Sequence, residues 1–252
     1  MIVLCYHAVT DANWPTQLAV TPEALTRQVG RLLRKGLVGR TFSAAVAEPD
    51  RRTFAVTFDD AYASVPERAF AVLSRLGVPG TVFVPTAHAG NGGLMAWPGT
   101  ENWIGTEWQG ELRAATWDQL RELAAAGWEI GSHSHTHPHL TSLSDSELAV
   151  EMAESRRVCE QQIGAPCTSI AYPYGDTDER VAAASRSAGY ACGGALDSRA
   201  EAAPDRLRWP RLGAYARDTQ ARLAFKVWLF NRPALWNGLQ AAGRRLRRPA
   251  GR

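Results

Sequence analysis

Four histidines close together are the strongest chemical feature of this sequence of 252 residues. They directly follow an apolar stretch and are His133, His135, His137 and His139. Because imidazole is the commonest protein ligand for zinc and related ions, the cluster predicts a metal site. The pairs His133/His137 and His135/His139 each have an i, i+4 separation, which would bring two rings to one ion if the segment turned helically. The spacing alone does not choose between the pairs.

A pair of adjacent carboxylates is the best candidate for the remaining ligand. Asp59 and Asp60 directly follow the apolar residues 54–58. A catalytic zinc usually has three protein ligands and one open position. Two adjacent acids repel each other unless one is neutralised, so a metal bound to one would leave the other free as a base. The alternative is that both acids cap a helix, but residues 61–66 separate them from the next helical pattern.

Alternating strand-like and helix-like segments must position these groups. Strands are expected at residues 2–6, 53–58, 81–84, 128–130, 169–172, 190–196 and 207–209. Helices are expected at residues 22–35, 66–76, 117–126, 145–163 and 179–188. Repeated strand–helix units predict an α/β fold with a parallel sheet, and about seven strands fit one closed barrel better than two domains. Chemistry in such barrels lies at the carboxyl ends of the strands, where the two acids fall.

Three motifs, in this order, resemble those of the polysaccharide deacetylases, the NodB homology domain of carbohydrate esterase family 4. They are Thr57-Phe58-Asp59-Asp60, His133-Ser134-x-x-His137-Pro138 and Tyr172-Pro173-Tyr174-Gly175. The resemblance extends over about residues 1–215. It implies an incomplete (β/α)7-type barrel, NodB-like, to which we expect a C-terminal helical basic tail to be added.

The resemblance also implies a role for each motif residue. Asp59 would be the catalytic base, and Asp60, His133 and His137 would bind a divalent metal, zinc before cobalt or nickel. The Ser after the first His and the Pro after the last one favour this pair over His135/His139. In the third motif, Pro173 and the backbone N–H of Tyr174 would contact the substrate and its oxyanion.

Two departures from the family pattern stand out. The third motif usually has an Arg that orients the catalytic Asp, and Ala171 occupies that position here. Arg211 is the candidate replacement for the missing charge. The usual C-terminal Leu-x-His, which provides the general acid, is also absent, since no His follows His139.

The start of the chain offers a substitute for the missing acid. Leu4-Cys5-Tyr6-His7 resembles the opening of a subgroup that includes the biofilm poly-N-acetylglucosamine deacetylases. In a closed barrel the first and last strands are neighbours, so one place in space can be reached from either terminus. His7 is then the expected general acid, and a packed histidine at a strand end is the alternative.

The function implied is a metal-dependent hydrolase that removes N-acetyl groups from an amino-sugar-containing glycan. One alternative is a deformylase or deacetylase of a lipid-linked or small sugar. Another is a glycan-binding protein that keeps the fold with weak catalysis. The long loop at residues 87–111 contains three tryptophans, which would form either a sugar-stacking platform or a small core. They are Trp97, Trp103 and Trp108.

The charge is distributed unevenly along the chain. The net charge is +3, yet residues 219–252 alone contain eight basic and no acidic side chains, so residues 1–218 carry −5. We therefore expect a catalytic barrel at 1–218 and a basic amphipathic tail at 219–252. Aromatic and Arg residues in the tail suit an anionic membrane surface, and a helix packed on the barrel is the alternative. No nucleic-acid partner is expected.

Cysteine usage and the N-terminus bear on the compartment. The four cysteines are scattered, without a C-x-x-C pair, and are interpreted as buried or free thiols of a reducing compartment. The N-terminus lacks the basic and apolar regions of a secretory signal. The expectation is a cytoplasmic protein, with peripheral association at the inner membrane surface if the tail binds lipid.

Overall fold

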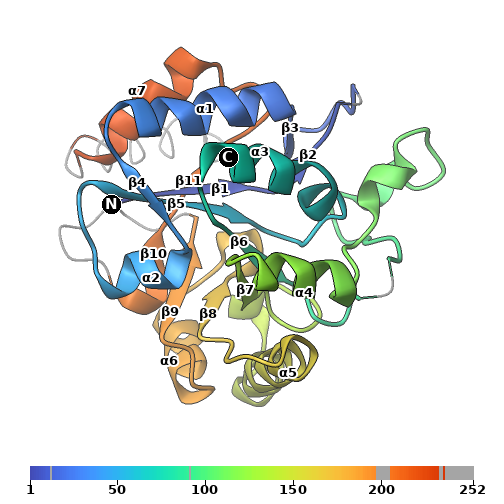
Figure 1. Ribbon diagram of the computed structural model, residues 1–252. Helices are drawn as coiled ribbons and strands as arrows, with labels where there is room; N and C mark the ends of the chain where they lie inside the picture. The colour runs from blue at the N-terminus through green and yellow to red at the C-terminus, as the bar shows by residue number, and fades with distance from the viewer. Residues whose placement is uncertain (12, 91, 197–204, 233–234, 236–252) are drawn as a thin grey trace, which may run out of the picture.

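A parallel sheet that curves into a nearly closed barrel forms the centre of the molecule (Figure 1). The computed structural model describes residues 1–11, 13–90, 92–196, 205–232 and 235. The strands of this sheet are β1 (Ile2–Tyr6), β4 (Val38–Arg40), β5 (Thr53–Phe58), β6 (Gly80–Val84), β7 (Glu129–Ser132), β8 (Ser169–Ala171), β9 (Cys192–Ala195), β10 (Trp209–Pro210) and β11 (Leu212–Gly213). All pair in parallel, so every strand points its carboxyl end to the same rim.

One segment of chain closes the barrel. The strand order runs β10-β9-β8-β7-β6-β5-β1-β11, and only Arg211 separates β10 from β11. The first half of this segment therefore pairs with β9, while its second half pairs with β1. The expected incomplete (β/α)7-type barrel is confirmed, since β10 and β11 end the strand order without pairing with each other, and β4 is added beside β5.

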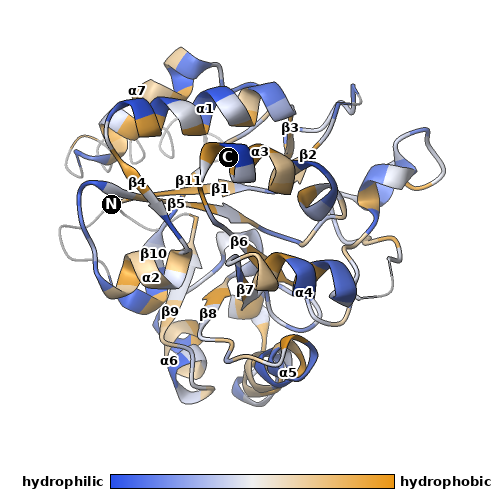
Figure 2. Cartoon of the chain, viewed as in Figure 1, coloured by the Kyte–Doolittle hydropathy of each residue, from blue (hydrophilic) through white to orange (hydrophobic). Residues whose placement is uncertain are grey.

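Helices surround the sheet on its outer side (Figure 1). They are α1 (Pro22–Arg34), α2 (Phe42–Ala47), α3 (Phe70–Leu76), α4 (Trp117–Ala125), α5 (Asp145–Ile163), α6 (Glu179–Ser187) and α7 (Gln220–Phe230). Local sequence explains where they begin: Thr116 and Ser144 form capping boxes for α4 and α5. Figure 2 shows hydrophilic and hydrophobic residues side by side on α1, as expected for a helix with one face on a core.

Two apolar layers hold the barrel together. The larger cluster lies between the sheet and the helices, and a smaller one fills the barrel interior from Val3, Ala55, Phe83 and Ala171. All four cysteines are free and buried, which agrees with their interpretation as unpaired thiols.

Several short elements differ from the expectation. A small parallel pair, β2 (Ala8–Val9) with β3 (Ala19–Val20), lies beyond the barrel strands, and α2 was not anticipated. A π-helical turn, Val65–Ala69, precedes α3. The strand expected at 207–209 begins only at Trp209, because Arg206–Arg208 form a 3-10 turn. Elements of two or three residues have too little hydrophobic pattern to be recognised.

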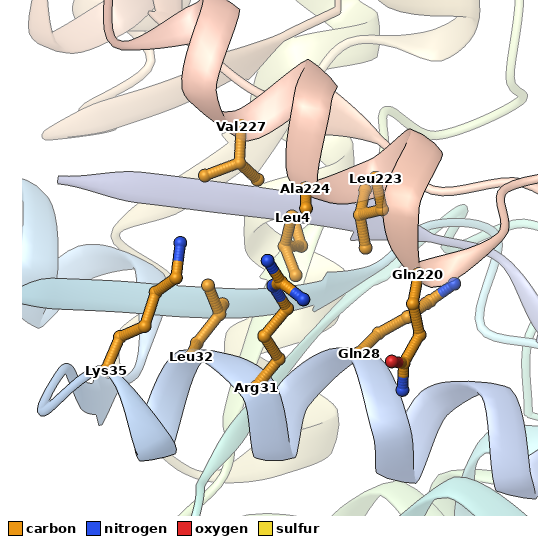
Figure 3. A pocket seen from close by; sticks show the side chains of 9 residues that line it. All are labelled: Leu4, Gln28, Arg31, Leu32, Lys35, Gln220, Leu223, Ala224 and Val227. Atoms are coloured by element: carbon orange, nitrogen blue, oxygen red, sulfur yellow. The ribbon is translucent and has the colours of Figure 1, made fainter.

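The C-terminal helix α7 packs beside α1 (Figure 3). Its residues Leu223, Val227 and Phe230 belong to the main core cluster. Lys226 also pairs with the buried Asp218 at 2.5 Å. The domain boundary at 218 stays a prediction. After Arg232, the basic amphipathic tail expected at 219–252 lies, apart from Leu235, outside the described residues. Among the helices that the structure describes, none has the length and hydropathy of a membrane span.

Candidate active site

Loops that leave the carboxyl ends of neighbouring strands bring the predicted groups together. His7 follows β1, Asp59 and Asp60 follow β5, and His133 follows β7. Because β5, β6 and β7 are neighbours and parallel, the loops after β5 and β7 meet above the end of β6. The residues singled out from the sequence therefore converge at one rim of the barrel.

Asp60, His133 and His137 form a buried triad. Their ligand atoms lie within 4.8 Å of one another. Asp60 Oδ1 lies 3.4 Å from His133 Nε2 and 3.3 Å from His137 Nε2. Each of the three residues is at most 5% exposed. The two histidines converge through a loop and not through a helical turn, because Ser134 and His137 have left-handed backbones.

The donor set fits a divalent metal ion. His133 Nδ1 lies 2.9 Å from the Ala171 carbonyl, which can only accept, so Nδ1 carries the proton and Nε2 presents a lone pair to Asp60. A lone pair facing a carboxylate oxygen is repulsive unless a cation lies between them. In the metal-free site a proton is the alternative cation: although burial alone lowers the pKa of His133, the charges of Asp59 and Asp60 raise it.

All non-glycine residues with positive φ in the described chain lie in this region. They are Asp60 (69°), Ala61 (53°), Ser134 (65°), His137 (62°) and Tyr174 (59°). A left-handed backbone is unfavourable for side chains with a Cβ, so surrounding contacts must hold it. Such a concentration of strained residues is typical of a functional site.

Asp59 is held by Arg211, which lies between β10 and β11. The Arg211 guanidinium binds its carboxylate through two hydrogen bonds, 2.6 Å to Oδ1 and 2.8 Å to Oδ2, and the pair is almost fully buried. Burial opposes ionisation, but the charge of Arg211 lowers the pKa of Asp59 to about 2. Gly194 provides the space, since a Cβ there would lie 2.6 Å from Arg211 Nε. The charge missing at Ala171 is thus supplied from the segment between β10 and β11, since Gly194, which contacts Arg211, is the sheet partner of Ala171.

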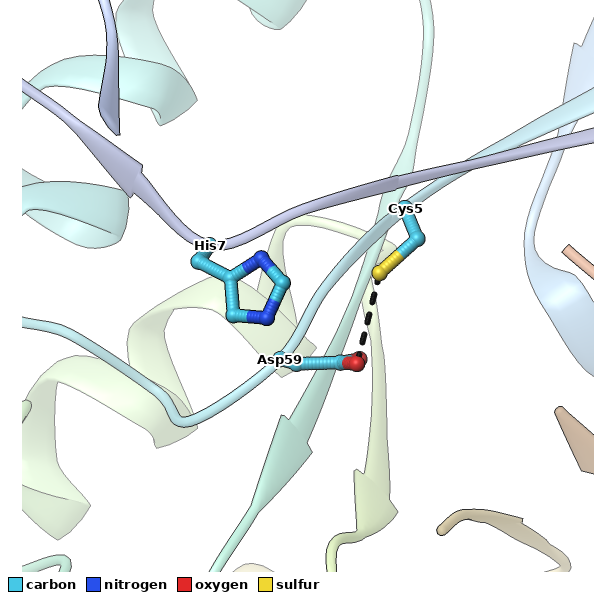
Figure 4. Close-up of side chains that lie close together, drawn as sticks. All are labelled: Cys5, His7 and Asp59. Carbon is cyan, nitrogen blue, oxygen red and sulfur yellow. Dashed lines mark hydrogen bonds between the residues drawn. The ribbon is translucent and has the colours of Figure 1, made fainter. Parts of the chain in front are cut away.

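His7 and Cys5 lie beside Asp59 (Figure 4). Their potential ligand atoms and those of Asp59 lie within 4.8 Å of one another. The Cys5 thiol donates to Asp59 Oδ2 at 3.3 Å, while His7 Nδ1 is buried without a hydrogen-bond partner among the described residues. Cys5 was missed at the sequence level, although it lies near the end of β1, two residues before His7.

Tyr174 and Trp97 flank His137 of the triad. The Trp97 ring stacks on it with 4.1 Å between centroids, and Tyr174 meets it edge-on at 4.8 Å. Tyr174 is 38% exposed and follows the buried Pro173. Among the described residues, none accepts a hydrogen bond from the Tyr174 N–H.

The other histidines do not join the triad. His135 Nδ1 contacts Thr86 Oγ1 at 3.0 Å, and His88 packs edge-on against Trp97. His139 is exposed at the rim, where it stacks on the Tyr174 ring with a centroid distance of 4.1 Å.

The tryptophan-containing loop folds around a small core of its own. Trp97 is only 9% exposed, and it clusters with Trp14, Tyr62 and Met95. Trp103 and Trp108 pack against this cluster. Of the two interpretations offered for the tryptophans, this arrangement agrees with the small core.

Sequence comparison connects the site to known proteins. The family model described as polysaccharide deacetylase matches residues 47–193. YxkH of Bacillus subtilis (strain 168), assigned by name to the polysaccharide deacetylases, is 27% identical over 197 residues, which is 76% of this chain and 62% of that protein. The poly-beta-1,6-N-acetyl-D-glucosamine N-deacetylase of Staphylococcus aureus (strain MRSA252) is 23% identical over 60% of this chain and 50% of its own length. The chain thus spans about three fifths to one half of these relatives.

Structural comparison supports the same architecture. The Streptococcus pyogenes deacetylase PplD, solved in complex with acetate, aligns with a TM-score of 0.73 at 19% identity. The alignment covers 89% of this chain and 96% of that one. At this level of identity the likeness establishes the barrel fold.

Proposed function

Since the chain belongs to the polysaccharide deacetylase family, we propose that it hydrolyses N-acetyl groups of an amino-sugar-containing glycan with the help of a divalent metal ion. One observation carries this proposal: the triad Asp60, His133 and His137 lies next to Asp59, a second carboxylate held by Arg211. The family resemblance assigns the ligands and the base to separate side chains. In agreement with this, Asp59 pairs with Arg211 and is not one of the three triad residues.

The triad would hold the metal ion, for which we propose zinc. Two imidazoles and one carboxylate are a common protein ligand set for catalytic zinc, and an open position remains for water or substrate. The chemistry that such an ion supplies is polarisation of the amide carbonyl and acidification of water.

Asp59 is the proposed proton acceptor for the attacking water. Both of its oxygens accept from Arg211, so the carboxylate is fixed in orientation and stays ionised above a pKa of about 2. Oδ1 retains a second lone pair for the incoming proton, whereas Oδ2 accepts from both Arg211 and the Cys5 thiol. The buried guanidinium also stabilises the arrangement by balancing the charge of Asp59.

His7 is the proposed proton donor to the leaving amine. Its ring lies beside Asp59 and follows β1, whereas the triad residues follow β5 and β7. An amide nitrogen leaves poorly unless it is protonated, and a positioned imidazole supplies the proton near neutral pH. Tyr174 would donate its free backbone N–H to the oxyanion, with Pro173 lining the substrate side.

Acetate release from defined substrates tests this function. The panel contains poly-β-1,6-N-acetylglucosamine, short N-acetylglucosamine oligomers, a lipid-linked N-acetylated sugar and their N-formyl counterparts. We expect acetate from the N-acetylated glycans, loss of activity with a chelator and recovery with Zn²⁺. Formate release, or activity confined to the lipid-linked sugar, would favour the deformylase or small-sugar alternative. Binding without any hydrolysis would favour the glycan-binding protein.

The basic C-terminal region suggests where the enzyme acts. We propose peripheral association with an anionic membrane surface on its cytoplasmic side. The support is the charge of +8 over residues 219–252, together with the exposed aromatic side chains Phe225 and Trp228 of α7. The permuted subgroup, with His7 as its acid, is likewise part of this proposal.

A further inference from the structure

A single acidic side chain holds the segment between the two histidine ligands from outside the barrel. Glu151, in the middle of α5, is only 9% exposed. Its Oε2 accepts the backbone N–H groups of His135, at 2.8 Å, and of Thr136, at 2.9 Å. Its Oε1 accepts the hydroxyl of Thr136 at 2.5 Å. Because Glu151 lies two turns into the helix, these contacts do not cap α5.

Two of the backbone N–H groups between His133 and His137 depend on Glu151 for a hydrogen-bond acceptor. The His133 N–H completes the sheet ladder to β6. The Ser134 N–H donates to the Ser132 hydroxyl, and the His137 N–H donates to the Ser134 hydroxyl. The remaining two N–H groups both go to Glu151. No helical hydrogen bond replaces them, so removing the carboxylate leaves two partly buried donors without an acceptor.

The backbone that these contacts stabilise is a strained one. Ser134 and His137 both have left-handed backbones, with φ of 65° and 62°, which are unfavourable for residues with a Cβ. On the opposite side, the N–H groups of Thr86 and Ala87 donate to the carbonyls of residues 134 and 135. The loop is thus held by hydrogen bonds to both Glu151 and the segment after β6. In this backbone conformation His137 Nε2 lies 3.3 Å from Asp60 Oδ1.

We propose that Glu151 is a positioning residue, which fixes the loop between His133 and His137 in its metal-binding conformation before the metal binds. This inference rests on the proposed metal site. Groups that orient metal ligands typically contribute a factor of about 10–100 to metal affinity. Glu151 acts through the backbone of the loop, and not on the imidazole nitrogens.

Zinc affinity of the metal-free full chain tests the inference, measured by competition with a chromophoric chelator. Glu151→Leu keeps the bulk and removes both acceptors, and we expect its Kd for Zn²⁺ to rise about 10–100-fold. Glu151→Gln retains one carbonyl oxygen for the two N–H groups, so its Kd should stay close to that of the wild type. The matched control is Glu154→Leu: Glu154 lies on the same helix but pairs with Arg157 at the surface.

The outcomes separate this inference from the proposed function. If the wild type binds no zinc, the metal site itself is wrong. If the wild type binds zinc and a folded Glu151→Leu binds equally well, or Glu151→Gln is as weak as Glu151→Leu, only the role of Glu151 is overturned. Hydrogen exchange on the metal-free wild type decides the matter if Glu151→Leu does not fold. Protected amides at His135 and Thr136 are expected, and fast exchange that slows only with zinc would contradict pre-organisation.

Discussion

The neighbouring carboxylates Asp59 and Asp60 have different surroundings although they are adjacent in sequence. Asp60 faces two imidazole nitrogens, while Asp59 faces a guanidinium and a thiol. The two side chains meet different partners because the backbone at Asp60 is left-handed, which turns the chain directly after β5. One carboxylate is therefore suited to bind a metal and the other to accept a proton.

Replacing Arg211 tests whether this side chain stabilises and orients the Asp59 carboxylate. We predict that Arg211→Met lowers the free energy of unfolding of the metal-free chain by about 3–5 kcal/mol, because it leaves a buried carboxylate without its partner. Arg211→Lys keeps the charge but not the bidentate geometry and should lose less stability. Urea unfolding measures both effects, with acetate release as a second readout.

Arg157→Met is the control for that comparison. Arg157 pairs with Glu154 at the surface of α5, where such changes usually stay within about 0.5 kcal/mol. If Arg211→Met is as stable and as active as this control, the buried pair does not orient the base.

The sequence was informative for site residues that carry their own chemistry. The clustered histidines and paired acids indicated a metal site, and the family motifs separated the ligands from the base. Cys5, Gly194 and Glu151 could not be recognised in this way, because their roles depend on what lies opposite them in space. For Arg211 only the missing charge at Ala171 gave a hint, and the bidentate contact required the closed barrel.

At the scale of elements, strong local signals fixed the long segments. The boundaries of β1 and β5 were predicted to the residue, and the capping box at Ser144 marked the start of α5. The loops after the strands were not predictable. Their conformations depend on non-glycine residues with a left-handed backbone, and the type of such a residue does not predict that conformation.

Helix α7 allows a test of membrane association that leaves the core intact. Shortening the chain at Asp218 would remove Leu223 and Val227 from the core, so point substitutions are the better test. Phe225 and Trp228 are about half exposed and stack on each other, and Arg232 lies over the Trp228 ring at 4.1 Å. Aromatic and cationic groups together suit the interface of an anionic bilayer.

We predict that the full chain sediments with anionic vesicles and not with phosphatidylcholine vesicles. The double substitution Phe225→Ser and Trp228→Ser should weaken this binding, as should high salt. Val150→Ser is the matched control, since Val150 is a 63% exposed apolar residue on α5. Equal sedimentation with both kinds of vesicle would contradict the membrane proposal.

At the scale of the whole molecule, closure of the barrel connects the fold to the chemistry. The segment between β9 and β1 that closes the barrel contains Arg211. This segment places the Arg211 guanidinium beside Asp59. The first strand delivers His7 to the same rim. Residues separated by about 200 positions thus meet in one site because the first and last strands are neighbours.

The most direct test of the account is a joint measurement on Asp59→Asn: bound zinc per chain, and acetate released from an N-acetylated glycan. Wild type and Asp60→Asn are measured beside it. The account predicts that Asp59→Asn retains about one zinc while its acetate release falls roughly 10²–10⁴-fold, the usual contribution of a proton-transfer group. Asp60→Asn should lose the zinc as well. Full activity of Asp59→Asn, or loss of its zinc while Asp60→Asn retains it, would contradict the assignment of base and ligand.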